Sequence, residues 1–322
     1  MNDAMGTKAD IVVGVDGSDE SFAALKWAMR EAGLTGQKVN AVFGWTHSWD
    51  TGPEPDSDEA WNTMRHEIAA ELREWVDKAS EGIDFDPEDL KLTSVKASGT
   101  SALLQIGADA QQIVVGRRSL GRVLRWFMGS LSASLAEEAE VPVTVVRIMD
   151  GEDESVQDEI ANALTPSDVR VRFAQPVQPL DQERRPVVVG VDGSETSRHA
   201  LDFAIDQARV HGRPLHVMFC WQLKDLGSVP GYENAVPPVE AGQKRAQEIL
   251  DAMVDGAAIP ADMTVERHAF HIPASKGLIS ASRYASHLVV GSRGLSGLDA
   301  HFLGSVSKQI VNFAECTVTV VH

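Results

Sequence analysis

The sequence predicts two tandem α/β domains, each a five-stranded, mainly parallel sheet with helices on both faces. The motif VVGVDGS at residues 12–18 returns at residues 188–194. Later, IVVG at 113–116 with GS at 129–130 returns as LVVG at 288–291 with GS at 304–305. Two motifs repeated in the same order at matched spacing indicate duplication of a whole domain. Continuous apolar strands alternating with helices are typical of parallel sheets covered on both faces.

Each element follows from local sequence. Short apolar, β-branched runs bounded by turn residues predict strands. The Asp-Gly-Ser turn after the first run is typical of a helix cap, and apolar residues at helical spacing, such as Phe22, Leu25 and Met29, predict the helix that follows. The expected strands are 11–15, 39–45, 90–96, 113–116 and 143–147 in the first half, and 187–191, 214–221, 263–270, 288–291 and 317–322 in the second.

Length and composition agree with this organisation. The chain has 322 residues, enough for two domains, here 1–147 and 186–322, joined by a linker at 148–185. Its net charge of −18 argues against nucleic acid or an acidic membrane as a partner, since both are bound by clustered Lys and Arg. No apolar run approaches the roughly 20 residues of a membrane span. With two cysteines and no signal-like start, a cytoplasmic protein is expected.

The strongest candidate site lies in the second half. Gly291 ends a buried strand, and Gly294, after Arg293, lets the loop turn sharply or bring its backbone against a ligand. Gly304 and Ser305 open the next helix, whose first N–H groups and dipole suit a phosphate. Each piece alone is equally consistent with a glycine turn and a serine cap that serve only the fold.

Aspartates follow the first strand of each half, Asp16 and Asp192. A carboxylate there can accept hydrogen bonds from a ribose hydroxyl or an adenine amine. The alternative is a local Asx-turn within Asp-Gly-Ser. His268 and His271 are close in sequence, but no Cys, Asp or Glu completes a metal set beside them, so no metal site is expected.

The combination of VGVDGS with a later Gly-x2-Gly-x9-Gly-Ser resembles the universal stress protein family, over about residues 8–147 and 186–322. The resemblance implies flavodoxin-like (Rossmann-like) domains and, in the branch with the glycine motif, binding of ATP, with or without Mg²⁺. It implies that the nucleoside meets the turn formed by Gly190, Val191 and Asp192 and the backbone near Cys220. The phosphates and ribose would meet Gly291, Arg293, Gly294, Gly304 and Ser305.

The first half departs from this pattern at one position, because Ser119 replaces the second glycine. A Cβ there disfavours positive φ and crowds the phosphate path. Arg117, Arg118 and Arg122 add positive charge nearby. Weaker binding is expected in this half, with an empty or altered site as the alternative. Its candidate residues are Asp16, Gly44, Gly116, Ser119, Gly129 and Ser130.

The leading hypothesis is a regulatory module of the stress response that binds an adenine nucleotide. The sequence lacks the Gly-x4-Gly-Lys-Ser/Thr loop and the Gly-x-Ser-x-Gly elbow, so catalysis has little support. The alternatives are a slow ATP hydrolase or adenylate-transferring enzyme, and a nucleotide-free structural interaction protein. The resemblance also implies pairing of the two domains through their last strands, 143–146 against 317–320, and is compatible with a homodimer.

Overall fold

The computed structural model describes residues 10–46, 57–117, 130–148, 185–294 and 303–322. The chain divides into two units, Met1–Ile148 and Met149–His322, called domains 1 and 2 below. Nearly all of the expected linker, residues 149–184, lies outside the described residues.

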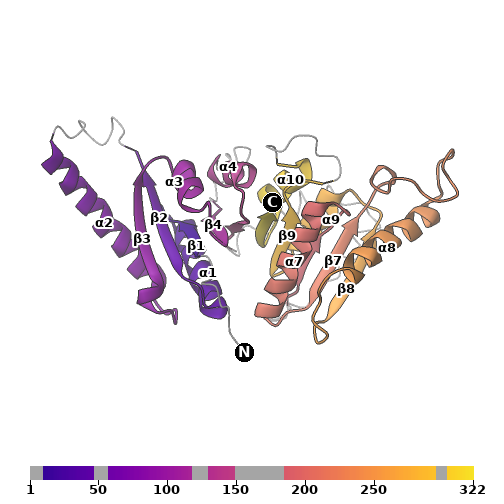
Figure 1. The fold of residues 1–322 in the computed structure, drawn as a ribbon, viewed down its shortest axis with the longest axis horizontal. Coiled ribbons are helices and arrows are strands. Elements are labelled where there is room, and N and C mark those ends of the chain that lie inside the picture. The colour runs from indigo at the N-terminus through magenta and orange to yellow at the C-terminus, as the bar shows by residue number, and fades with distance from the viewer. Residues whose placement is uncertain (1–9, 47–56, 118–129, 149–184, 295–302) are drawn as a thin grey trace, which may run out of the picture. The chain divides into compact units, whose positions relative to one another are not determined.

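Domain 1 contains five parallel strands in the order β3-β2-β1-β4-β5 (Figure 1). Strands β1 and β4 are neighbours although they are far apart in sequence, so the strand order reverses between them. In chain order the elements are β1 (Ile11–Gly14), α1 (Asp19–Thr35), β2 (Val39–Trp45), α2 (Asp58–Ser80), a 3₁₀ turn (Pro87–Asp89), β3 (Leu90–Lys96), α3 (Gly99–Ile106), β4 (Gln112–Gly116), α4 (Ser130–Glu138) and β5 (Val143–Val146).

Domain 2 repeats this topology, with five parallel strands in the order β8-β7-β6-β9-β10. The reversal falls between β6 and β9. Its elements are β6 (Val187–Gly190), α7 (Glu195–Val210), β7 (Leu215–Cys220), a 3₁₀ turn (Leu223–Asp225), α8 (Val239–Asp255), β8 (Val265–Phe270), α9 (Ala274–Ser282), β9 (His287–Gly291), α10 (Ser305–Phe313) and β10 (Thr317–Val321).

The predicted fold class is therefore confirmed, and several boundaries agree closely. Strands β2 and β3 have the predicted bounds. In domain 2, β7 begins one residue later and ends one residue earlier than expected. Proline, which lacks an N–H, stands at 214, and the buried Trp221 lies just beyond the strand end.

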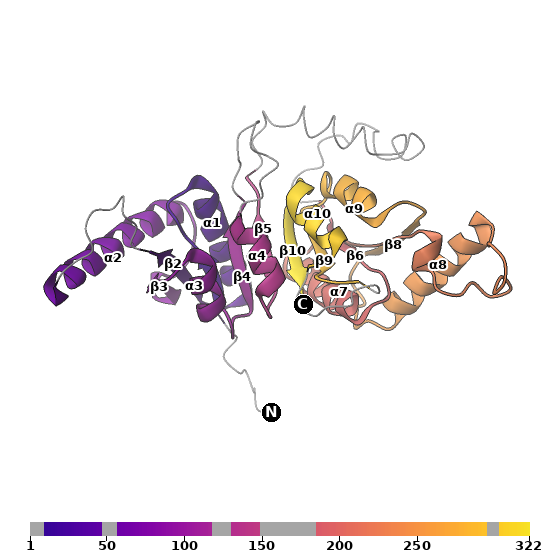
Figure 2. The same cartoon turned by 90° about the horizontal axis from the view of Figure 1, so that it is seen from above.

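Helices cover both faces of each sheet. Figure 2 shows α1 and α2 on one side of the domain 1 sheet and α3 and α4 on the other, and α7 and α8 opposite α9 and α10 in domain 2. In domain 1, alternate strand residues such as Ile11 and Val13 pack with Leu25 and Met29 of α1. Helix α2 buries Leu72 and Val76. Among the described residues, none of the helices has the length and apolarity that crossing a bilayer requires.

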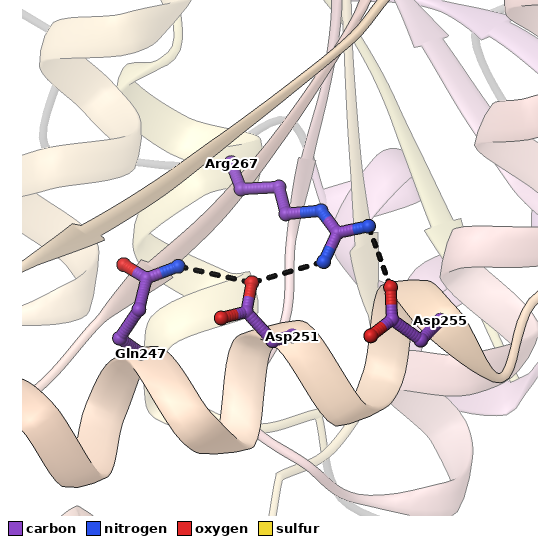
Figure 3. A network of polar contacts seen from close by, with 4 residues as sticks. All are labelled: Gln247, Asp251, Asp255 and Arg267. Atoms are coloured by element: carbon purple, nitrogen blue, oxygen red, sulfur yellow. Dashed lines mark hydrogen bonds and ion pairs between the residues drawn. The ribbon is translucent and has the colours of Figure 1, made fainter.

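A polar network joins α8 to β8, the edge strand of the described domain 2 sheet. The guanidinium of Arg267, on β8, donates to Asp251 at 3.0 Å and to Asp255 at 2.7 Å, both on α8 (Figure 3). Gln247 donates to the same Asp251 oxygen at 3.1 Å. The hydrogen bond from Arg267 is the main cause that lowers the pKa of Asp251. Arg267 therefore points from β8 toward the face that carries α8.

Candidate functional site

The sequence-predicted residues gather at the carboxyl ends of the strands where the strand order reverses. In each domain the first strand (β1 or β6) pairs with the fourth (β4 or β9), and the helices after these two strands leave in different directions. Such a switch point opens a crevice in which doubly wound sheets bind ligands. The Asp-Gly-Ser turns and the glycines at 116 and 291 all lie at this end of the sheets.

The Asp-Gly-Ser turn has the same structure in both domains. In domain 2, the Ser194 N–H donates to Asp192 Oδ1 at 3.0 Å, and Ser194 Oγ caps α7 by accepting from Ser197 N–H at 3.2 Å. Gly193 has φ of 89°, which favours glycine. In domain 1 the Ser18 N–H donates to Asp16 Oδ1 at 3.1 Å. The Asx-turn is thus present, and it uses one carboxylate oxygen, Oδ1.

The second oxygen of Asp192 faces the glycine loop. A Cβ built on Gly294 would overlap Asp192 Oδ2. The two motifs, about a hundred residues apart in sequence, therefore meet at one point. Gly294 does not have positive φ, so the turn conformation expected from sequence is not what requires glycine here. The close approach of its backbone to the Asp192 carboxylate is the physical reason.

The start of α10 faces the same loop. Gly304 is the N-cap residue and has no side chain to cap the helix, so Ser305 is the first helical residue rather than the cap. The Gly304 N–H donates to the Ser292 carbonyl at 2.8 Å, and Ser307 Oγ donates to the Gly291 carbonyl at 2.7 Å. These bonds hold the helix start against the end of β9. Its first N–H groups have no side-chain cap from residue 304, unlike those of α7.

Sequence reasoning did not single out two polar groups beside this loop. Within the described residues, Ser292 Oγ and His322 Nε2 are buried and have no hydrogen-bond partner. Burial and then the positive charge of Arg293 lower the pKa of His322 to about 4. A buried polar atom without a partner is costly, and a ligand can supply the missing bond. Ser292 lies within the Gly-x2-Gly motif but is not one of its glycines, and no motif marked His322.

Cys220 ends β7 beside the crevice, and its side chain fills part of the space there. It is buried, and burial raises the pKa of its thiol to about 12. The neutral thiol is a poor nucleophile at neutral pH. A Cβ built on Gly277 of α9 would overlap Cys220 Sγ. The neighbouring Trp221 is fully buried, stacks on His271 with 4.3 Å between ring centroids and donates from Nε1 to Gln243, so it packs within the domain.

Domain 1 has a cavity at the corresponding place. Its volume is about 300 Å³, near the lower end of the roughly 300–1,000 Å³ range of small-molecule pockets. Three predicted site residues, Asp16, Gly44 and Gly116, line it. The remaining lining residues are Gly14, Val15, Ser18, Glu20, Ser21, Val42, Gly99, Leu103, Val115 and Ser132.

The close approach of backbones shapes this cavity. A Cβ on Gly44 would come within 2.8 Å of the Gly99 Cα, and one on Gly116 would overlap the Glu20 carbonyl of α1. Ser130 is the first residue of α4. The other predicted residues, Ser119 and Gly129, lie outside the described residues, as do Arg118 and Arg122.

Comparisons with known proteins agree with the duplicated fold. The profile described as the Universal stress protein family matches residues 9–147 and 183–322. A universal stress protein of Mycolicibacterium smegmatis is 30% identical to this chain, with 98% of each chain covered. One of Mycobacterium tuberculosis is 29% identical, with 96% of each covered.

Solved structures show the same architecture at lower identity. A universal stress protein from Archaeoglobus fulgidus superposes with a TM-score of 0.59 and 16% identity, covering 97% of both chains. A functionally unknown protein from Pseudomonas aeruginosa gives a TM-score of 0.56 and 17% identity, covering 99% of this chain and 94% of that one. Because the family profile matches both halves, the chain belongs to the universal stress protein family, which it matches in two tandem segments.

Proposed function

We propose that this protein is a regulatory module of the stress response that binds ATP at two unequal sites, the tighter one in domain 2. The observation that carries the proposal is the contact of Asp192 with Gly294 at the switch point of domain 2. It supports a single site made from the aspartate turn and the glycine loop. Family membership supports the regulatory role.

The chemistry of domain 2 suits a nucleotide. Asp192 offers a carboxylate to ribose hydroxyls or an adenine amine. The uncapped start of α10 offers backbone N–H groups and a positive dipole end to phosphates. Arg293 adds a guanidinium, and Ser292 adds a buried hydroxyl that has no partner among the described residues. Mg²⁺, where present, would enter with ATP as part of the ligand.

Domain 1 is proposed as the weaker site. Its cavity is lined by Asp16 and by four glycines, which leave room for a ring system against the backbone: Gly14, Gly44 and Gly116 of the strands and Gly99 at the start of α3. Ser119 stands where domain 2 has Gly294. In domain 2, a Cβ on Gly294 would overlap the Asp192 carboxylate, and the serine at the corresponding position of the domain 1 sequence is our reason for proposing a lower affinity there.

The test of nucleotide binding is direct. Purified protein is denatured, and the released nucleotide is identified and counted per chain; stripped protein is then titrated with ATP in a thermal-shift assay. The proposal expects adenine nucleotide in the released fraction and stabilisation by ATP, because a ligand that binds only the folded state raises stability. An absence of both would refute it and favour the structural interaction protein. Steady-state release of phosphate or AMP would instead favour the slow enzyme.

Pairing of the two domains and a cytoplasmic location are also proposed. The family resemblance drawn from the sequence implies pairing of the two domains through their last strands, with homodimerisation as an open addition. Light scattering after gel filtration measures the oligomeric state. Cytoplasmic location is tested by cell fractionation.

A further inference from the structure

Three metal-ligating side chains of domain 2 lie together, away from the nucleotide site. Strands β7 and β8 are parallel, and His216 of β7 is the register partner of Glu266 of β8. His268 follows two residues later on β8, so its side chain points to the same face as that of Glu266. The intervening Arg267 points to the opposite face, where it binds α8 (Figure 3).

The polar atoms of the three side chains converge. His216 Nε2 lies 3.6 Å from Glu266 Oε2, and His268 Nε2 lies 3.3 Å from the same oxygen. One ligand atom from each residue lies within 4.8 Å of the other two. These separations exceed the roughly 2.7–2.9 Å of a strong charge-assisted hydrogen bond. They are near the ~3.4 Å that separates two donors held at tetrahedral angles about 2.1 Å from one metal ion.

The surroundings hold the rings in place and leave access to solvent. The Phe270 ring stacks on His268 with 5.6 Å between centroids, and Tyr284 lies beside His216 at 6.4 Å. Tyr284 is itself held by donating to the sulfur of Met218 at 3.8 Å. In the described part of domain 2, β8 is the last strand of the sheet. The side chain of Glu266 is 54% exposed, whereas that of His216 is 17% exposed.

We infer that His216, Glu266 and His268 form a binding site for a late first-row divalent cation such as Zn²⁺. Two imidazoles and one carboxylate are a donor set that Zn²⁺ accepts, with water completing the coordination sphere. The ion would join β7 to the edge strand β8. Glu266 and His268 are close in the sequence, but the third member, His216, lies fifty residues before Glu266. The neighbouring His271 is stacked on Trp221 instead.

Domain 1 provides an internal comparison. Its equivalent strands pair Asn40 with Lys91, and Thr93 stands where domain 2 has His268. There, Thr93 Oγ1 donates to Asn40 Oδ1 at 2.8 Å. The same backbone therefore accepts a purely hydrogen-bonded pair at these two positions. Asparagine at 216 and threonine at 268 are substitutions that this fold already tolerates in its other copy.

The experiment uses the full chain without an affinity tag, treated with a chelator and then titrated with Zn²⁺ by calorimetry. Co²⁺ absorption spectra report the ligand geometry of the same site. The variants are His216→Asn/His268→Thr and, at the more exposed position, Glu266→Gln. His199→Asn, an exposed histidine of α7, is the matched control. Melting of each metal-free variant shows that it is folded.

The expected result is one Zn²⁺ per chain in the wild type and in the His199→Asn control. Since loss of groups that merely support a ligand costs about 10–100-fold, both site variants are expected to weaken Zn²⁺ binding by at least about tenfold. The Co²⁺ spectrum should change with them. Absence of saturable Zn²⁺ binding would overturn the inference. So would binding that both site variants leave unchanged, because the ion would then sit elsewhere.

Discussion

The two domains share the Asp-Gly-Ser turn but fill the space beside it differently. In domain 1, Gly44 of β2 faces Ala102 of α3, and a cavity of about 300 Å³ opens beside them. In domain 2, the equivalent strand ends in Cys220, and its sulfur occupies the space that a Cβ on Gly277 of α9 would need. At this contact between strand and helix, domain 1 has Gly44 and Ala102, whereas domain 2 has Cys220 and Gly277. The smaller residue of the pair therefore lies on the strand in domain 1 and on the helix in domain 2.

The domains also differ in sequence where the glycine loop meets the Asp-Gly-Ser turn. Domain 2 places Gly294 against Asp192, whereas domain 1 has Ser119 at the corresponding point of its sequence. The repeated motif keeps the same backbone in both domains, and we propose that single positions beside it set the nucleotide affinity.

Substituting Gly294→Val should lower ATP affinity at the tight site by about 100-fold, or ~2.7 kcal/mol. The added side chain displaces the Asp192 carboxylate, because its Cβ would overlap Oδ2. Calorimetric titration of stripped protein measures the effect. The reciprocal change in domain 1, Ser119→Gly, should strengthen the weak site. Equal affinities before and after both changes would contradict the role given to this contact.

Substituting Gly277→Ala should destabilise domain 2 by about 1–3 kcal/mol, as overpacking of a filled core does. The new Cβ would overlap the sulfur of Cys220. Adding Cys220→Gly recreates the Gly-Ala contact of domain 1 and should recover much of the loss. A double-mutant cycle in urea measures the coupling between the two positions. Simple additivity would show that the two contacts are not equivalent.

The helix caps should behave alike, because here the domains do not differ. Ser18 caps α1 and Ser194 caps α7 with the same hydrogen bond, at 3.2 Å in both cases. Substituting either serine by alanine is expected to cost about 1 kcal/mol. Hydrogen exchange of the α1 and α7 amides reports each domain separately. If the loss of stability in one domain were several times larger than in the other, the two caps would not be equivalent.

The smallest effect concerns pH. Burial lowers the pKa of His322 to about 4, so between that value and the ordinary 6.5 the unfolded state binds more protons than the folded state. The contribution of His322 to the free energy of unfolding is fully present above pH 6.5. It falls as the pH decreases, by less than about 1 kcal/mol down to pH 6. His322→Gln should flatten this slope, measured as melting temperature against pH.

Domain 1 has Arg147 at the position after its last strand, where domain 2 has His322. Arginine does not titrate in this range, so its domain should lack this part of the acid sensitivity. Burial also lowers the pKa of His216, so the stability of domain 2 keeps a residual dependence on pH with the same sign. An unchanged slope in the His322→Gln variant would show that His322 is not the titrating group.

The fold was predictable because its signals are local. Apolar runs, turn residues and caps are read within a few residues, and β2 and β3 have the predicted bounds. The meeting of Asp192 with the glycine loop was also within reach, because both follow strands that end at one edge of a parallel sheet. The sequence did not reveal why Gly294 must be glycine, since the reason is a contact and not a backbone angle.

Contacts that depend on the register between two distant strands could not be predicted from the sequence. His216 meets Glu266 and His268 only because β7 and β8 pair in one particular register. A shift by one residue would send these side chains to opposite faces. Ser292 and His322 are buried and have no hydrogen-bond partner among the described residues, and this likewise follows from how β9, β10 and their loops pack. Such groups can be found only once the strands are in place.

Titration of stripped protein with ATP, comparing Asp16→Asn with Asp192→Asn, tests the central claim most directly. Asparagine keeps the oxygen that accepts from Ser18 or Ser194 N–H but removes the charge; Asp202→Asn on the exposed face of α7 is the control. We expect two sites in the wild type, loss of the tight one in Asp192→Asn and loss of the weak one in Asp16→Asn. Loss of the tight site in Asp16→Asn, or no ATP binding at all, would contradict the proposal of two unequal sites.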